Sequence, residues 1–139
     1  MGRLAGIEIK EECQEKFNAL NHGKYSYVIY RLNDSLDQIE VVKAVAEGGR
    51  AGLEAELADV SDSRYAVLDY EFTTDDGGQR KKLCFVSWCP EDTNKRRRMT
   101  HASSKDVLKR SLGLTVEVQA TDISELSEEE FRSKFKNIS

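Results

Sequence analysis

The sequence is poor in the residues that mark several protein classes. Its 139 residues include one proline and nine glycines, which excludes collagen-like sequences and Pro- or Gly-rich linkers. Runs of about 18 apolar residues are absent, so we expect no membrane-spanning helix. The three cysteines are an odd number without framework spacing, which favours a reduced cytosolic or nuclear protein. The length predicts a single domain over residues 1–139, and the 39% hydrophobic content is enough for a packed core.

Residues that carry catalysis or bind metals are equally sparse. His22 and His101 lie far apart and have no Cys or His at ligand spacing, so we predict no metal site. Cys84 and Cys89 are five positions apart on an expected strand, which directs them to opposite faces. The stretch GGRAG at 48–52 lacks the Gly-Lys-Ser/Thr ending of a phosphate-binding loop. The sequence therefore favours a binding protein with no catalytic residue, cofactor or metal over an enzyme.

Charge is unevenly distributed along the chain. The net charge is −4, from 21 basic and 25 acidic side chains. Residues 1–79 carry a balance of −8, residues 80–110 a balance of +7, and residues 111–139 a balance of −3. Positive charge concentrated in one stretch of an acidic protein indicates a local anionic partner. A general polyanion binder would be basic overall, and this chain is not.

Hydrophobic periodicity predicts alternating helices and strands. Helical spacing appears over 8–21, around Leu53 and Leu57, over 92–112, and after Ser127, which matches a capping box with Glu130. Strand patterns cover 25–32, 38–45, 64–72, 81–89 and 114–120, with a turn at Asp76-Gly77. The third and fourth strands are apolar on both faces near their centres, so helices should cover both sides of the sheet. We predict an α/β (α+β) sandwich with five strands.

The helix at 95–112 carries a basic stripe. Five residues fall within an arc of roughly 80° on a helical wheel, with Met99 and Asp106 beside them: Lys95, Arg98, Ala102, Lys105 and Lys109. The opposite side is clearly apolar only after Val107. Two interpretations stay open, because charge runs are usually solvated surface. Met99 favours a binding face, since a flexible apolar side chain suits an imperfect groove.

The KRRR run at 95–98 also allows a nucleic-acid or phosphoinositide-binding module. No aromatic residues are interleaved with it to stack on bases, which weakens the nucleic-acid interpretation. This class of binding module remains the alternative hypothesis.

The stretch FVSWCPEDTNKRRRMTHASSKDVLKRSLG, followed by VEVQATDISELSEE, resembles the ADF/cofilin family of actin-depolymerising proteins. The family pattern runs W-x-P, basic-x-basic-Met, then Tyr-Ala-Ser-Ser-Lys-Asp. AG at 5–6, RYAVLDYEF at 64–72 and GGQRKK at 77–82 extend the similarity over nearly the whole chain. The resemblance implies the ADF-homology (ADF-H) fold over residues 1–139, a central mixed sheet flanked by helices.

The resemblance also implies a function. Family members bind monomeric and filamentous actin, prefer its ADP form, sever filaments and promote depolymerisation, without a catalytic residue or cofactor. We further expect a monomer, located in the cytoplasm on the actin cytoskeleton, with the nucleus as a second location. Phosphoinositides are implied as competing ligands of the basic surface, and nucleic acid is not expected as a partner.

Two sets of site residues follow from matching positions in the family. The surface for monomers and filaments comprises Ala5, Gly6, Ile7, Arg96, Arg98, Met99, Lys105 and Lys109, with Met99 as its apolar anchor. The filament-only surface comprises Arg80, Lys82 and Lys134.

The sequence departs from the family pattern in four respects. Ala5 replaces the family's phosphorylatable Ser, and no Ser, Thr or Tyr precedes Tyr25, so N-terminal phosphorylation should not regulate this protein. Ser133 and Asn137 replace residues that are charged in some relatives, so filament binding should be weaker than monomer binding. His101 replaces a Tyr, and Arg97 adds charge on a side of the helix that is usually small; the sequence predicts no role for either.

Overall fold

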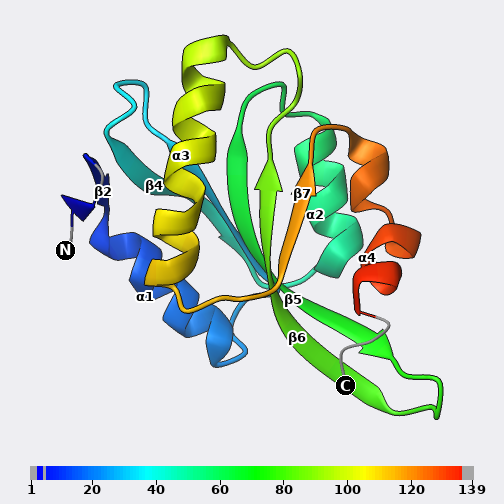
Figure 1. The fold of residues 1–139 in the computed structure, drawn as a ribbon. Coiled ribbons are helices and arrows are strands. Elements are labelled where there is room, and N and C mark those ends of the chain that lie inside the picture. Colours follow the sequence, from blue (N-terminus) through cyan, green and yellow to red (C-terminus); the bar gives the residue numbers. More distant parts are fainter. Residues whose placement is uncertain (1–2, 5, 136–139) are drawn as a thin grey trace.

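The computed structural model of the protein describes residues 3–4 and 6–135 (Figure 1). The described elements are, in chain order, β1 (Arg3–Leu4), β2 (Ile7–Ile9), α1 (Glu11–Asn21), β3 (Tyr27–Leu32), β4 (Gln38–Val45), α2 (Gly49–Ala58), β5 (Arg64–Thr73), β6 (Gln79–Trp88), α3 (Lys95–Ser111), β7 (Glu117–Ala120), the 3₁₀-helix η1 (Ile123–Leu126) and α4 (Glu128–Phe135).

The strands of the described residues form one mixed sheet in the order β1-β2-β4-β3-β5-β6-β7. The central pairs are antiparallel: β4 with β3, β3 with β5, and β5 with β6. The pairs β2 with β4 and β6 with β7 are parallel. The predicted sandwich class is confirmed. The predicted count of five strands is wrong, because β1 and β2 extend the sheet to seven strands within the described residues.

The predicted start of the first helix is also wrong, because β2 occupies the residues before it. Helix α1 begins at Glu11, not at residue 8, because Glu8 and Ile9 lie in β2 opposite Gln38 and Ile39 of β4. Ile9 is buried and so fits the apolar spacing of a helix as well as that of a strand. Strand pairing with a distant segment decided between the two patterns.

Two core clusters lie on opposite faces of the sheet. Cys13, Phe17 and Leu20 of α1 and Leu108 of α3 pack against one face. Leu53 and Leu57 of α2 and Phe131 and Phe135 of α4 pack against the other face. Figure 1 shows the first pair of helices on the left and the second pair on the right. As predicted, β5 and β6 lie inside the sheet and are covered on both sides.

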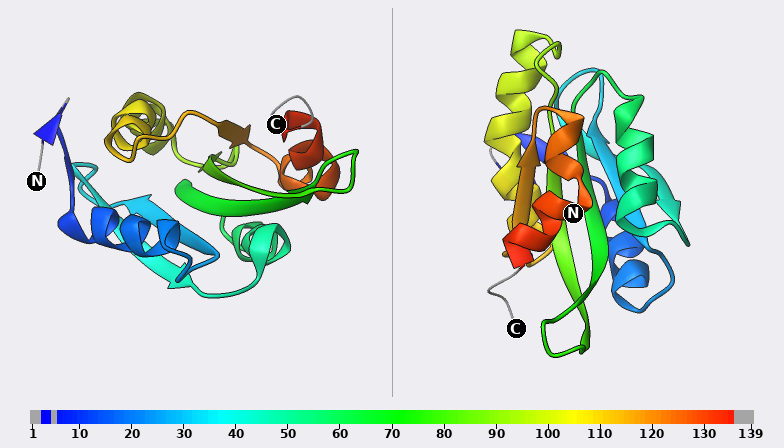
Figure 2. Two further views of the ribbon diagram at one scale, coloured as in Figure 1. Left: turned by 90° about the horizontal axis from the view of Figure 1, so that it is seen from below. Right: turned by 90° about the vertical axis from the view of Figure 1, so that its right-hand side faces the viewer.

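The β5–β6 hairpin projects beyond the rest of the sheet, as both views in Figure 2 show. Its turn lies at the predicted position, where Gly77 adopts a φ of +85° and donates its N–H to the Thr74 carbonyl at 2.9 Å. Glycine favours this turn because it adopts positive φ without steric cost.

The cap of the last helix is only half of the predicted capping box. Ser127 Oγ accepts the Glu130 N–H at 3.2 Å, but the Ser127 N–H donates to the Ser124 carbonyl instead of to Glu130. A complete capping box lies one element earlier, between Asp122 and Glu125 at the start of η1.

None of the helices in the described ranges is both long and apolar enough to span a membrane.

Candidate functional site

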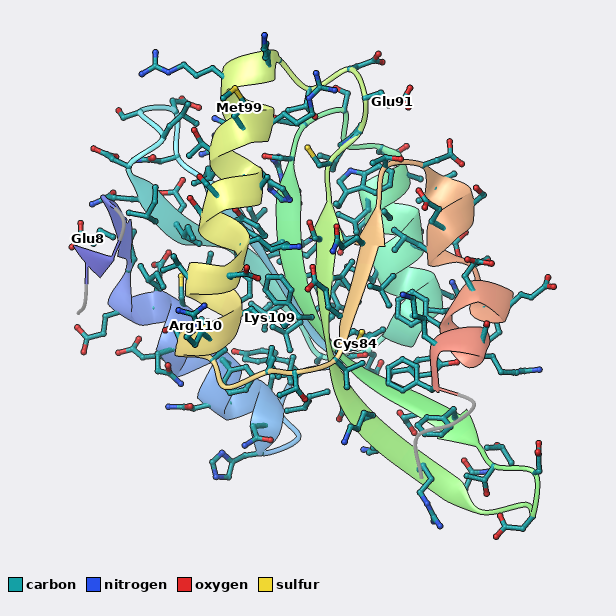
Figure 3. The ribbon with its side chains drawn as sticks, in the orientation of Figure 1. Glu8, Cys84, Glu91, Met99, Lys109 and Arg110 are labelled. Atoms are coloured by element: carbon teal, nitrogen blue, oxygen red, sulfur yellow. The ribbon has the colours of Figure 1, made fainter. Side chains whose placement is uncertain are left out.

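The first two turns of α3 present an exposed basic and apolar surface. Asn94 caps the helix, since its Oδ1 accepts the N–H of Arg97 at 2.8 Å. Arg96 and Arg98 are exposed, and Met99 is 63% exposed. Figure 3 shows Met99 near the start of α3, at the end of the helix far from Arg110. A flexible thioether that is this exposed, with basic side chains around it, can adapt to the surface of a partner.

Lys105 and Lys109 differ from these arginines because they are already paired. Their ammonium groups each lie 2.9 Å from a carboxylate oxygen of Glu117, the first residue of β7. Burial alone would raise the pKa of the Glu117 carboxyl, but the two lysines lower it below its usual value. The predicted stripe is therefore divided into a free half at the start of α3 and a half at its end whose lysines are paired with Glu117.

Replacing Glu117 with Gln should lower the free energy of unfolding by about 1–2 kcal/mol. The change leaves two neighbouring, partly buried ammonium groups without their carboxylate. Urea unfolding at pH 7 measures the loss, and Glu91→Gln at an exposed position provides the matched control. Equal stability of the two variants would contradict a structural role for this ion-pair cluster.

Before Val107, the buried face of α3 consists of polar residues, because the sequence has few apolar residues there. His101 is buried and stacks on the Tyr65 ring, with centroids 4.2 Å apart and an interplanar angle of 7°. Its Nε2 lies 2.8 Å from Ser87 Oγ, and the Tyr65 hydroxyl donates to the His101 carbonyl at 2.7 Å. Burial lowers the pKa of His101 to about 4, so the imidazole is neutral at pH 7. His101 thus serves as a core residue.

Arg97 also faces inward, in contrast to the arginines on either side of it. It is buried, and its guanidinium donates to the carbonyls of Leu32 and Asn33 at 2.9 and 3.1 Å. No role could be predicted for Arg97 or His101 from the sequence, because their partners lie far away in the chain.

The predicted N-terminal part of the surface is described only in part. Ala5 lies outside the described residues. Gly6 is exposed in the turn between β1 and β2 with a φ of +79°. The Ile7 side chain is buried in the same core cluster as Leu108 of α3, so it does not belong to the exposed surface of this structure.

The three residues predicted for a second surface lie on one side of the sheet. Arg80 and Lys82 share a face of β6 with Cys84, which packs in the same core cluster as Phe131 and Phe135 of α4. Lys134 is exposed on α4 itself. Arg80 and Lys82 are exposed on the projecting part of the hairpin, so the fold brings these three cations to the α4 side, away from α3.

Two of the cysteines are buried and unreactive. Burial raises the pKa of the Cys13 and Cys84 thiols to about 12, which leaves both as inert thiols at pH 7. Within residues 3–4 and 6–135, no group of three or more His, Cys, Asp or Glu is placed to hold a metal ion.

Comparisons with known proteins agree with the fold and with the resemblance. A family described as "Cofilin/tropomyosin-type actin-binding protein" matches residues 6–136. A cofilin from Mycosarcoma maydis is 40% identical over 125 residues, which are 88% of this chain and 89% of that protein. Actophorin from Acanthamoeba castellanii is 39% identical over 137 residues, or 96% of this chain and 97% of that protein. The crystal structure of Streptomyces griseoflavus cofilin matches with a TM-score of 0.83 at 37% identity, covering 93% of this chain and 96% of that one. The fold and the basic start of α3 agree with these similarities, which establish that the chain belongs to the ADF/cofilin family.

Proposed function

We propose that this protein binds actin monomers and filaments, prefers ADP-actin, and promotes the severing and depolymerisation of filaments in the cytoplasm. Membership of the ADF/cofilin family supports the choice of partner. The observation that carries the proposal is the free end of α3, where Met99 is 63% exposed between basic side chains. Gly6, which the family pattern assigns to the same surface, is exposed as well.

The surface suits a helix-in-groove complex. Met99 supplies the apolar group that is desolvated in the groove, and Arg96 and Arg98 supply charge that complements acidic actin. Such charges mainly speed encounter and fix orientation. Lys105 and Lys109 belong to the same surface, but both are paired with Glu117, which offsets one of their two positive charges, so they should contribute less to binding than the arginines do.

Severing requires a second contact. The patch of Arg80, Lys82 and Lys134 lies on the α4 side, and α3 lies on the opposite side of the sheet. A molecule bound through both patches would bridge two filament subunits. Severing then follows if the protein binds a twisted filament state better than the resting state, because such binding shifts the population of filament states without a chemical step.

Cosedimentation with actin filaments tests this proposal. The protein should pellet with filaments, and the actin left in the supernatant should rise as the protein approaches stoichiometric amounts, measured at two pH values. Unchanged supernatant actin at stoichiometric protein would contradict the depolymerising activity.

Replacing Met99 with Ala should weaken monomer binding by about 1–2 kcal/mol, or roughly 5- to 30-fold in dissociation constant. Stability should be unchanged, because the side chain is exposed. Titration of labelled actin monomers measures the loss. Val42→Ala is the matched control, since Val42 is 43% exposed on β4. Equal affinities of the two variants would remove Met99 from the interface.

A further inference from the structure

Arg97 is the member of the basic run at 95–98 that does not face solvent. Its side chain is 8% exposed, whereas Arg96 and Arg98 on either side are exposed. A buried guanidinium cannot itself touch actin. It therefore needs a different explanation from its neighbours.

Its contacts join α3 to two distant connections. The two carbonyls that accept from the guanidinium belong to Leu32, the last residue of β3, and Asn33 beyond it. Nε lies 3.4 Å from Asp62 Oδ1, in the connection between α2 and β5. Nη2 also lies 3.7 Å from Asp34 Oδ1, a carboxylate that Arg31 holds at 2.8 Å. One side chain thus ties the start of α3 to the ends of two other elements.

This arrangement satisfies a cation whose burial is otherwise costly. Removing a guanidinium from water costs several kcal/mol unless hydrogen bonds and counter-charges replace the lost solvation. The planar fork serves two adjacent carbonyls at once, which the point charge of a lysine ammonium does not. The backbone N–H of the same residue is held by Asn94, so the first turn of α3 is fixed through both its backbone and a side chain.

We propose that Arg97 is a positioning residue for the actin-docking surface. It fixes the first two turns of α3, so that Arg96, Arg98 and Met99 are presented in one arrangement before actin arrives. A surface ordered in advance loses less conformational entropy on binding, which raises affinity without a new contact. This inference rests on the proposed function.

Two substitutions, Arg97→Met and Arg97→Lys, test it. Both should weaken binding of actin monomers by about tenfold and speed amide hydrogen exchange over residues 95–100. Arg97→Lys keeps the positive charge but lacks the planar guanidinium that donates to both carbonyls. Its affinity for actin should therefore be no higher than that of Arg97→Met. Arg132→Met, which removes one exposed positive charge from α4, should leave monomer affinity within about twofold.

A stability control separates positioning from general destabilisation. Leu57→Ala removes a fully buried side chain from the opposite core cluster, and its actin affinity is measured well below the unfolding temperature. If Leu57→Ala weakens actin binding as much as Arg97→Met does, Arg97 acts through stability and the inference is wrong. Binding of Arg97→Lys at the affinity of the unaltered protein would also overturn it.

A milder variant covers the case in which Arg97→Met does not fold. Asp62→Asn removes one counter-charge and keeps both carbonyl contacts, so we expect a two- to threefold loss of affinity, of the order seen for weak ion pairs, with faster exchange over residues 95–100. Unchanged affinity and exchange in Asp62→Asn would contradict the inference.

The double charge reversal Arg96→Glu/Arg98→Glu in the same assay distinguishes a failure of the proposed function from a failure of the positioning role of Arg97. If it leaves monomer capture intact, the proposed function itself fails. If it abolishes capture while Arg97→Met matches Leu57→Ala, only the positioning role fails.

Discussion

Reversing the charges of Arg96 and Arg98 together is expected to weaken the binding of actin monomers by at least about a hundredfold. Both side chains are exposed at the free end of α3, next to Met99. Glutamates there would place like charges against acidic actin, which costs several kcal/mol in an interface. Because neither side chain is buried, the variant should fold with nearly unchanged stability.

The matched control reverses two exposed charges elsewhere, Lys24→Glu and Arg132→Glu. It lowers the net charge as much as the test variant does, so the general repulsion from actin is the same. Fluorescence titration of labelled actin monomers compares the two proteins. Capture by the Arg96/Arg98 variant at the level of this control would show that the start of α3 is not the docking surface.

Acid is expected to destabilise the protein through His101. Burial chiefly, with Lys105 and Arg97 nearby on α3, lowers the pKa of His101 from 6.5 to about 4, while Asp62 and Glu117 act in the opposite direction. The unfolded chain therefore binds a proton at this residue at higher pH than the folded protein does. The stability from the neutral imidazole is fully present above pH 6.5 and is lost as the pH falls towards 4, at a cost of about 3 kcal/mol.

Urea unfolding at several pH values between 7 and 4 measures this effect. In His101→Phe the ring can still stack on Tyr65 but cannot titrate, so the decline in stability over this range should be smaller by about 3 kcal/mol. His22→Gln, at an exposed histidine, should retain the full decline. Parallel curves for the unaltered protein and His101→Phe would mean that His101 does not control acid stability.

Local pattern was sufficient to predict the centre of the fold. β5 and β6 are apolar on both faces because both are covered by helices, and Asp76-Gly77 marks the turn between them. β1 and β2 were missed because strands of two and three residues are too short to show alternation. Ile9 fitted helical spacing equally well, and only its pairing partner on β4 decides between the two.

The basic face of α3 was predictable in outline, but its division into free and paired cations was not. A helical wheel places Lys105 and Lys109 in line with Arg98, yet it carries no information about what packs beside the helix. Glu117 reaches both lysines only because the chain turns back after α3, where Gly113 has a φ of +72°. From the sequence alone, Arg97 is indistinguishable from an exposed surface arginine, since the carbonyls it binds are 65 and 64 residues away in the chain.

Footprinting of Met99 tests the central claim most directly. The free protein exposes 63% of this side chain, so mild oxidation should convert it readily to the sulfoxide, which mass spectrometry detects. With saturating actin monomers, we expect its oxidation rate to fall by about tenfold, as for a side chain buried in an interface core. An unchanged rate on protein shown to be actin-bound would contradict the account, because actin would then be held by some other surface.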